Sequence, residues 1–202
     1  MAMYEAQELS KNIFYFKNAI SEPARLIDFI EKQDGEEDGN TKIISKWAPW
    51  RASNSPTDIY GEEKLISSNF KEKELTPNAK ELYIINSIRS NMHYICTQYK
   101  IYNDLEGDVK LDPEFGIKKY YVGESLGKHA DQYDGNFKLR FSIVAYLNDD
   151  YTGGELAFAN QNVMIKPEAG SIVIFPSSEP YLHESKELKS GVKYMCPGFW
   201  MH

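Results

Sequence analysis

The sequence predicts an α+β fold, in which a double-stranded β-helix (jelly-roll) core is flanked by N-terminal helices. Two observations support this fold class. Before about residue 115 the chain contains two segments with helical periodicity, and after it short β-type segments alternate with turns that contain glycine. Many short antiparallel strands usually close into a sandwich or jelly roll, so the helices are expected to pack on one outer face.

The N-terminal part is expected to supply a strand and two helices. Residues 12–20 are rich in aromatic and β-branched residues, which is typical of a strand. Residues 21–33 predict a helix with Ser21 as its N-cap. Apolar residues recur at spacings of three and four along 76–102, which predicts a longer helix. Between the two helices, residues 43–64 contain many turn signals and predict one or two short strands followed by a loop.

The C-terminal part is expected to form short strands separated by DG, GG and PEAG turns. The predicted strands are residues 117–123, 139–147, 155–159, 162–166, 171–175, 180–184 and 192–200. Consecutive short strands joined by tight turns pair antiparallel, so this part is the expected jelly roll.

Composition excludes several classes of protein. The chain has 202 residues, long enough for one domain with a substantial core, and a formal net charge of −7. An acidic chain without a basic face repels phosphate, which argues against nucleic acid as a partner. We find no apolar run of the roughly 18 residues that a membrane span needs and no hydrophobic signal core, so a cytoplasmic protein is expected. Its two cysteines show no CxxC spacing and are expected to be reduced, buried thiols.

The stretch GKHADQYDG places His129 and Asp131 two positions apart, on the same face of a strand. Alone this pair is weak, because an HxD arises easily by chance and also suits a polar strand end. His183 is the best third ligand, because His93 lies within the predicted long helix and His202 is the last residue. Two histidines and one carboxylate form the facial triad of non-haem Fe(II) oxygenases, which leaves positions for a bidentate co-substrate and dioxygen.

Lys193 follows His183 by ten residues. If 2-oxoglutarate chelates the iron through its keto acid, its distal carboxylate enters a dry region and needs a cation there. A turn at KSG lets the next strand return beside His183 and brings the Lys193 ammonium inside, where it can anchor that carboxylate. The alternative is an exposed strand lysine.

Five motifs follow one another between residues 115 and 202: YYVGESLGKHAD, LRFSIVAYLN, GGELAF, PEAGSIVIFPS and HESKELKSGVKYMCPGFW. In order and spacing they resemble the catalytic core of the prolyl 4-hydroxylase-like Fe(II)/2-oxoglutarate-dependent dioxygenases. The resemblance implies one dioxygenase domain over 1–202, with a strand and supporting helices in 1–114 and the catalytic jelly roll in 115–202. It implies Fe(II), 2-oxoglutarate as co-substrate and ascorbate as reductant. The triad residues are then both the metal ligands and the catalytic residues.

The resemblance also implies roles for individual aromatic and basic side chains. Tyr120 and Tyr146 correspond to tyrosines that contact 2-oxoglutarate in the family, although Tyr120 can also be a core aromatic. The remaining candidates, expected near the iron or the substrate, are Arg140, Trp47, Trp50, Tyr133, Phe199 and Trp200. For the aromatic candidates the alternative is simple packing, and for Arg140 it is an exposed position on its strand.

The expected reaction is hydroxylation of a C–H bond with release of succinate and CO2. By analogy the substrate is a prolyl residue of a peptide or protein, hydroxylated at C4, with dioxygen as the second co-substrate. One alternative is a hydroxylase of a free amino acid or another small molecule. A second, from a different class, is a non-catalytic jelly-roll binding module. No nucleic acid or membrane is expected as a partner.

Overall fold

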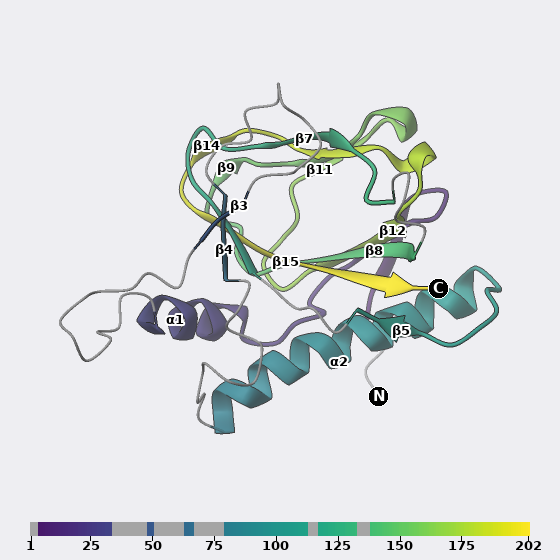
Figure 1. Ribbon diagram of the computed structural model, residues 1–202, viewed down its shortest axis with the longest axis horizontal. Coiled ribbons are helices and arrows are strands. Elements are labelled where there is room, and N and C mark those ends of the chain that lie inside the picture. The colour runs from purple at the N-terminus through teal and green to yellow at the C-terminus, as the bar shows by residue number, and fades with distance from the viewer. Residues whose placement is uncertain (1–3, 34–47, 51–62, 67–78, 113–116, 133–137) are drawn as a thin grey trace.

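Two β-sheets lie face to face and two helices lie on the outer side of one of them (Figure 1). The computed structural model describes residues 4–33, 48–50, 63–66, 79–112, 117–132 and 138–202. The paired sheets and the flanking helices confirm the predicted α+β jelly-roll fold.

The large sheet has nine strands within the described residues, in the order β1-β2-β12-β8-β15-β6-β4-β3, with β5 paired to β15. These strands are β1 (Ala6–Ser10), β2 (Ile13–Phe16), β3 (Ala48–Trp50), β4 (Glu63–Ile66), β5 (Lys110–Leu111), β6 (Ile117–Tyr120), β8 (Leu139–Tyr146), β12 (Ile172–Pro176) and β15 (Lys193–Met201). All of its pairs are antiparallel. The central strand β15 lies between β8 and β6, and both of these strands are distant from it in the chain.

The small sheet has the order β11-β10-β13-β7, and a further pair joins β14 to β9. Its strands are β7 (Leu126–His129), β10 (Leu156–Phe158), β11 (Val163–Ile165) and β13 (His183–Ser185), and the pair consists of β9 (Thr152–Gly153) and β14 (Leu188–Ser190). In Figure 1 these strands lie above β8, β12 and β15, so they cover the face of the large sheet that is turned away from the helices.

Successive side chains along each strand of the large sheet point to opposite faces, so they contribute to two separate apolar clusters. On β15, Met195 contributes to the cluster between the sheets, whereas Cys196 and Trp200 contribute to the cluster under the helices. We call the face of the large sheet that meets the small sheet its inner face, and the face that meets the helices its outer face. Tyr120, Val144, Tyr146, Val173 and Phe175 also lie on the inner face.

Helix α1 (Pro23–Gln33) and helix α2 (Ala79–Tyr102) cover the outer face. Buried apolar residues at spacings of three and four join α2 to the sheet: Ile88, Met92, Ile95 and Tyr99. A Cβ on Gly198 of β15 would lie 3.1 Å from the Met92 sulfur, so a glycine there allows the close approach of α2. The helix layer therefore fixes the position of β15, which also carries Lys193.

Several boundaries differ from those expected from the sequence. The strand predicted over 12–20 is the shorter β2, and Ser21 is not the cap, because α1 begins at Pro23 after Glu22 in a left-handed conformation (φ 52°). The strand predicted over 180–184 is partly a 3-10 turn, Glu179–Tyr181, before β13 begins at His183. A proline within this turn removes a backbone donor, which explains why strand pairing starts later.

The two cysteines are free and buried, as expected. Among the helices that the structure describes, none combines the length and the apolar character needed to cross a bilayer.

Candidate metal centre

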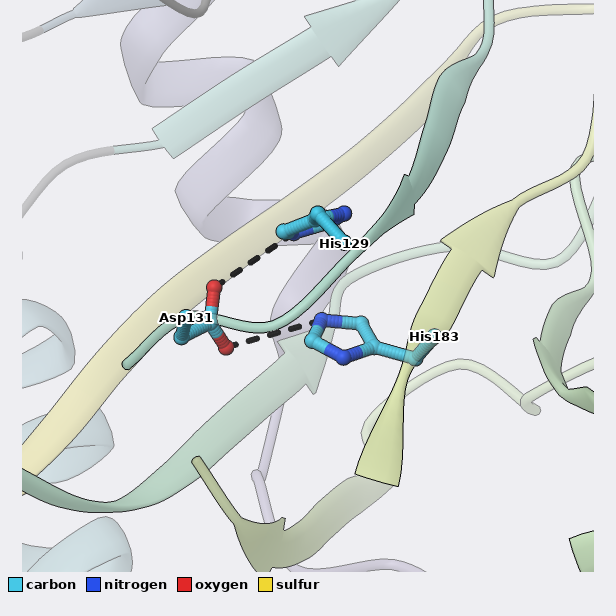
Figure 2. Close-up of side chains that lie close together, drawn as sticks. All are labelled: His129, Asp131 and His183. Carbon is cyan, nitrogen blue, oxygen red and sulfur yellow. Dashed lines mark ion pairs between the residues drawn. The ribbon is translucent and has the colours of Figure 1, made fainter. Parts of the chain in front are cut away.

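The pairing of β7 with β13 brings the two histidines together. His183 lies opposite His129 in the antiparallel register, and their ring centroids are 4.3 Å apart. Asp131 follows the end of β7 by two residues and directs its carboxylate between the two rings (Figure 2). One ligand atom from each of the three residues lies within 4.8 Å of the others, a spacing that one metal ion can bridge.

Each histidine ring is oriented by a backbone carbonyl. His129 Nδ1 lies 2.7 Å from the Gly127 oxygen and His183 Nδ1 lies 3.1 Å from the Tyr181 oxygen. Because a carbonyl oxygen only accepts, Nδ1 carries the proton in both rings, and the lone pair of the neutral imidazole is then on Nε2. Both Nε2 atoms face Asp131, at 3.4 Å from Oδ1 for His129 and 3.5 Å from Oδ2 for His183.

Two buried serines hold the carboxylate of Asp131. The Ser142 hydroxyl, on β8, donates to Asp131 Oδ2 at 2.5 Å and lies 2.8 Å from the Ser177 hydroxyl. The Ser177 carbonyl accepts a hydrogen bond from the amide of Gln132, the residue after Asp131. The carboxylate is therefore attached to the large sheet, although the histidines belong to the small sheet.

The electrostatics of the three residues favour an ionised carboxylate. Burial tends to raise the pKa of Asp131, but the hydrogen bond and positive charge that His129 supplies when protonated, the charge of His183 and the hydrogen bond from Ser142 outweigh it and lower the pKa to about 2. Burial tends to lower the pKa of His129, but the hydrogen bond and charge of Asp131 raise it above its ordinary value. For His183 burial dominates and lowers the pKa, so this ring stays neutral.

The site is dry on one side and open on the other. His183 contacts the rings of Phe175 and Phe158, at centroid distances of 4.6 and 5.7 Å. The exposed fractions of the side chains are 9% for His183, 16% for Asp131 and 25% for His129. Access from solvent is therefore on the His129 side.

Lys193 lies on the inner face and is 1% exposed, which excludes the alternative of an exposed strand lysine. Its ammonium donates to the Gly154 carbonyl at 2.7 Å and to the Ser185 hydroxyl at 2.8 Å. It also lies over the rings of Tyr120 and Tyr146, at 5.2 and 5.5 Å from their centroids. The structure thus brings together the lysine and both tyrosines expected at the co-substrate site.

Tyr151 also lies in this region, and sequence reasoning missed it. A Cβ on Gly154 would lie 3.3 Å from both the Lys193 side chain and the Tyr151 ring, so the two side chains flank the same glycine. The Tyr151 hydroxyl is buried and has no hydrogen-bond partner among the residues that the structure describes. A buried phenol of this kind is suited to a polar ligand.

The other predicted residues are distributed differently. Phe199 is half-buried and pairs in register with Ser142, so both lie on the inner face. The Arg140 guanidinium donates to the Glu106 carbonyl at 2.9 Å and lies over the Trp200 ring. Trp200 is fully buried on the outer face, so the structure does not bring Arg140 or Trp200 to the histidines.

Three predicted aromatic side chains are not among those that the structure describes. Trp47 and Tyr133 lie outside the described residues, and for Trp50 only the backbone, in β3, is described.

Comparisons with known proteins identify the family. Residues 115–202 match the 2OG-Fe(II) oxygenase superfamily. Over 166 residues the chain is 37% identical to a PKHD-type hydroxylase from Prochlorococcus marinus (strain NATL1A), which covers 78% of this chain and 69% of that protein. The chain belongs to the 2OG-Fe(II) oxygenase superfamily. Within this superfamily it is prolyl 4-hydroxylase-like, as the sequence motifs indicate.

Solved structures show that this 2OG-Fe(II) oxygenase has the fold of known members. A prolyl-4-hydroxylase from Pseudomonas putida matches with a TM-score of 0.62 and 17% identity, over 95% of this chain and 92% of that one. A prolyl hydroxylase from Trichoplax adhaerens, in complex with a peptide fragment of hypoxia inducible factor, matches with a TM-score of 0.68 and 14% identity, over 94% and 83%.

As a member of this superfamily the protein is a 2-oxoglutarate-dependent dioxygenase that uses Fe(II), 2-oxoglutarate and O2. The residues present fit both groups. Two neutral imidazoles and an ionised carboxylate are the donor set of non-haem Fe(II), and Lys193 with the buried Tyr151 hydroxyl suits an anionic, polar co-substrate.

Proposed function

We propose that this oxygenase hydroxylates a prolyl residue at C4 and that His129, Asp131 and His183 hold its Fe(II). The convergence of the three ligand atoms within 4.8 Å, with both Nε2 atoms turned to the carboxylate, carries the assignment of the Fe(II) ligands. When bound, Fe(II) supplies the chemistry that couples decarboxylation of 2-oxoglutarate to succinate and CO2 with hydroxylation of a C–H bond.

The residues around Lys193 would bind and orient the co-substrate. The buried ammonium pairs with the distal carboxylate, which without a cation would be too costly to remove from water. The rings of Tyr120, Tyr146 and Tyr151 lie around this end. Burial raises the pKa of Tyr146 and Tyr151, so these two phenols stay protonated and can donate hydrogen bonds. Ascorbate as a reductant stays a prediction.

The prolyl substrate is supported by the relatives rather than by a residue of this chain. The similar proteins with solved structures include prolyl hydroxylases, one of them bound to a peptide fragment. Phe199 beside Ser142 on the inner face supplies an apolar surface near the metal ligands, where a pyrrolidine ring can pack.

Incubation with proline-rich peptides, proteins and free L-proline tests the proposal. With Fe(II), 2-oxoglutarate and O2 present, the expected result is a mass increase of about 16 Da, one oxygen atom, on a prolyl residue of a peptide. Activity on free proline alone would instead assign the protein to the small-molecule hydroxylases. If an anaerobic titration with Fe(II) and 2-oxoglutarate gave no visible charge-transfer band, the non-catalytic binding module would be favoured.

Ser142→Ala is expected to weaken Fe(II) binding by about 10- to 100-fold while the fold is retained. The change removes the hydroxyl that donates to Asp131 Oδ2, so the carboxylate loses its attachment to β8 and can rotate away from the histidines. Ser171→Ala is the matched control, because this buried serine directly precedes β12 of the same sheet, at the strand end away from Ser142, and donates to the Glu168 carbonyl. Anaerobic metal titrations of both variants give the comparison, and equal affinities would show that Ser142 does not position Asp131.

Metal affinity is expected to decline as the pH falls through the raised pKa of His129. A proton on His129 competes with the metal, and its pKa lies above the ordinary 6.5 because of Asp131. His183 does not limit binding in this range, since its pKa is lowered, and Asp131 ionises near pH 2. Metal titrations at decreasing pH should show full affinity above the raised pKa of His129 and a decline that begins above the ordinary pKa of a histidine. A constant affinity would contradict this assignment.

A further inference from the structure

The ring of His183 is oriented by a group that lies outside its own strand. Its Nδ1 is 3.1 Å from the Tyr181 carbonyl, which belongs to the 3-10 turn Glu179–Tyr181 that precedes β13. For His129 the corresponding carbonyl is that of Gly127, within β7 itself. A strand is held in place by its pairing, whereas a three-residue turn needs other contacts. The position of the Tyr181 carbonyl therefore depends on what holds this turn.

One anchor of the turn is a side chain that follows β10. Gln161 ends the 3-10 turn Ala159–Gln161, and its amide Nε2 donates to the Pro180 carbonyl at 2.6 Å. Asn160 donates to the same oxygen at 3.3 Å. Because β10 pairs antiparallel with β13, the two turns leave the small sheet at the same end. The Gln161 amide oxygen is buried without a partner among the residues that the structure describes, and this arrangement costs free energy. The reverse amide orientation would instead set that oxygen against the Pro180 carbonyl.

A second anchor is Asn12, in the turn between β1 and β2. Its side-chain amide donates to the Tyr181 hydroxyl at 2.9 Å, and its backbone carbonyl accepts a hydrogen bond from the Tyr99 hydroxyl of α2 at 3.0 Å. Asn12 has a left-handed backbone conformation (φ 65°), which asparagine adopts more readily than most residues. A continuous set of hydrogen bonds thus runs from the helix layer through Asn12 to the residue whose carbonyl orients His183.

We propose that Asn12 and Gln161 are positioning residues that hold the Tyr181 carbonyl and through it keep His183 Nε2 directed at the metal. This inference rests on the proposed function, since it concerns a ligand of the same metal. If the turn is released, Nδ1 loses its fixed acceptor, so the ring can rotate and its proton can move to Nε2, which then cannot bind a metal ion. Asn12 lies outside the matched residues 115–202, so the N-terminal part of the chain acts on the metal site.

The bond between Asn12 and Tyr181 can be removed from either end. Asn12→Gly keeps the left-handed conformation without the amide, and Tyr181→Phe keeps the ring and the carbonyl without the hydroxyl. In anaerobic titrations each variant is expected to bind Fe(II) about 2- to 10-fold more weakly than wild-type protein. The double variant should bind no more weakly than the weaker single variant, because both changes remove one bond. Asn12→Asp should bind like wild-type protein, since the Tyr181 hydroxyl can donate to the carboxylate.

Gln161→Met tests the other anchor. It removes the donor to the Pro180 carbonyl at similar side-chain size, and it also removes the buried amide oxygen that has no partner. The metal-free protein should therefore not lose stability, whereas Fe(II) affinity should fall by about 2- to 10-fold. A residue with a structural role alone would not separate these two measurements.

NMR of the histidine ring nitrogens in metal-free protein shows whether the effect passes through His183. At alkaline pH the wild-type His183 ring is expected to carry its proton on Nδ1, and Asn12→Gly and Gln161→Met to show a mixture of both tautomers. His129 should stay unchanged in these variants, and His183→Ala assigns the signals. Tyr4→Phe removes a different tyrosine–asparagine bond, to Asn91 of α2, and is the control that should change neither the tautomer nor the Fe(II) affinity.

Two outcomes would overturn the inference. One is wild-type Fe(II) affinity in Gln161→Met and in both variants of the Asn12–Tyr181 bond, and the other is a loss of affinity in which His183 keeps its proton on Nδ1. If His183→Ala itself binds Fe(II) like wild-type protein, the assignment of the metal ligands fails separately. The ring-nitrogen NMR then still decides whether Asn12 and Gln161 orient His183, because it needs neither metal nor turnover.

Discussion

Replacement of Asp131 by alanine is expected to abolish formation of the Fe(II)–2-oxoglutarate complex and all succinate production. The carboxylate lies between the two Nε2 atoms and is the only anionic member of the cluster among the residues that the structure describes. Its removal leaves two neutral imidazoles that face each other at a ring distance of 4.3 Å. Because loss of a residue that only supports a ligand costs about 10- to 100-fold in metal affinity, loss of the ligand itself should cost more than about 100-fold.

The control for this prediction is Asp108→Ala. Asp108 is exposed, and its backbone carbonyl rather than its side chain accepts the hydrogen bond from Trp200. Both variants carry the same change of net charge, so a defect found only in Asp131→Ala belongs to the site. If Asp131→Ala still consumed 2-oxoglutarate at the wild-type rate, the assignment of the metal ligands would be wrong.

Lys193→Met is expected to raise the KM for 2-oxoglutarate by about 100-fold or more. A buried carboxylate that loses its only cationic partner pays its full desolvation cost, which is about 3–5 kcal/mol when one partner of a buried pair is removed. Methionine keeps the length and apolar stem of lysine, so the packing against Tyr120 and Tyr146 is largely retained. Initial rates of succinate formation at varied 2-oxoglutarate give the KM.

Two comparisons make this result specific to the distal carboxylate. Lys189→Met removes an exposed lysine in a surface ion pair with Glu187 and should leave the KM unchanged. A 2-oxo acid without a distal carboxylate should bind wild-type protein and Lys193→Met about equally. A variant that lost affinity for both acids would indicate general disruption of the inner face, because the Gly154 carbonyl and Ser185 hydroxyl also lose their donor.

Periodicity within single strands explains why much of the fold and site was predictable. His129 and Asp131 approach each other as their two-residue spacing predicted, although β7 ends at His129. Lys193 is inward as predicted, but the expected pairing was wrong: β15 pairs with β8 and β6 in the large sheet, not with the His183 strand β13. The two-residue period of a strand also predicts the inner position of Ser142, because it lies on the same face of β8 as Val144 and Tyr146. Its partnership with Asp131 was not predictable, because it depends on how the two sheets face each other.

The residues that were misplaced depend on contacts beyond one strand. Trp200 follows Phe199 directly, so it lies on the opposite face and packs under the helices. Arg140 has the inward alternation of Ser142 but lies near the strand end, where its long side chain folds over Trp200 and reaches the Glu106 carbonyl. That carbonyl belongs to the loop after α2, and no local pattern indicates that this loop passes there. The division of the chain at residue 115 stays a prediction.

The antiparallel pairing of β7 with β13 links folding to the creation of the metal site. The two strands are separated in the chain by five others that the structure describes: β8 and β12 of the large sheet, β10 and β11 of the small sheet, and β9, which pairs with β14. His129 and His183 therefore meet only after these long-range pairings have formed, and an unfolded or half-paired chain offers no preformed set of ligands. A metal ion that binds all three residues binds only the fully assembled jelly roll. By mass action it therefore raises the free energy needed to separate the two sheets.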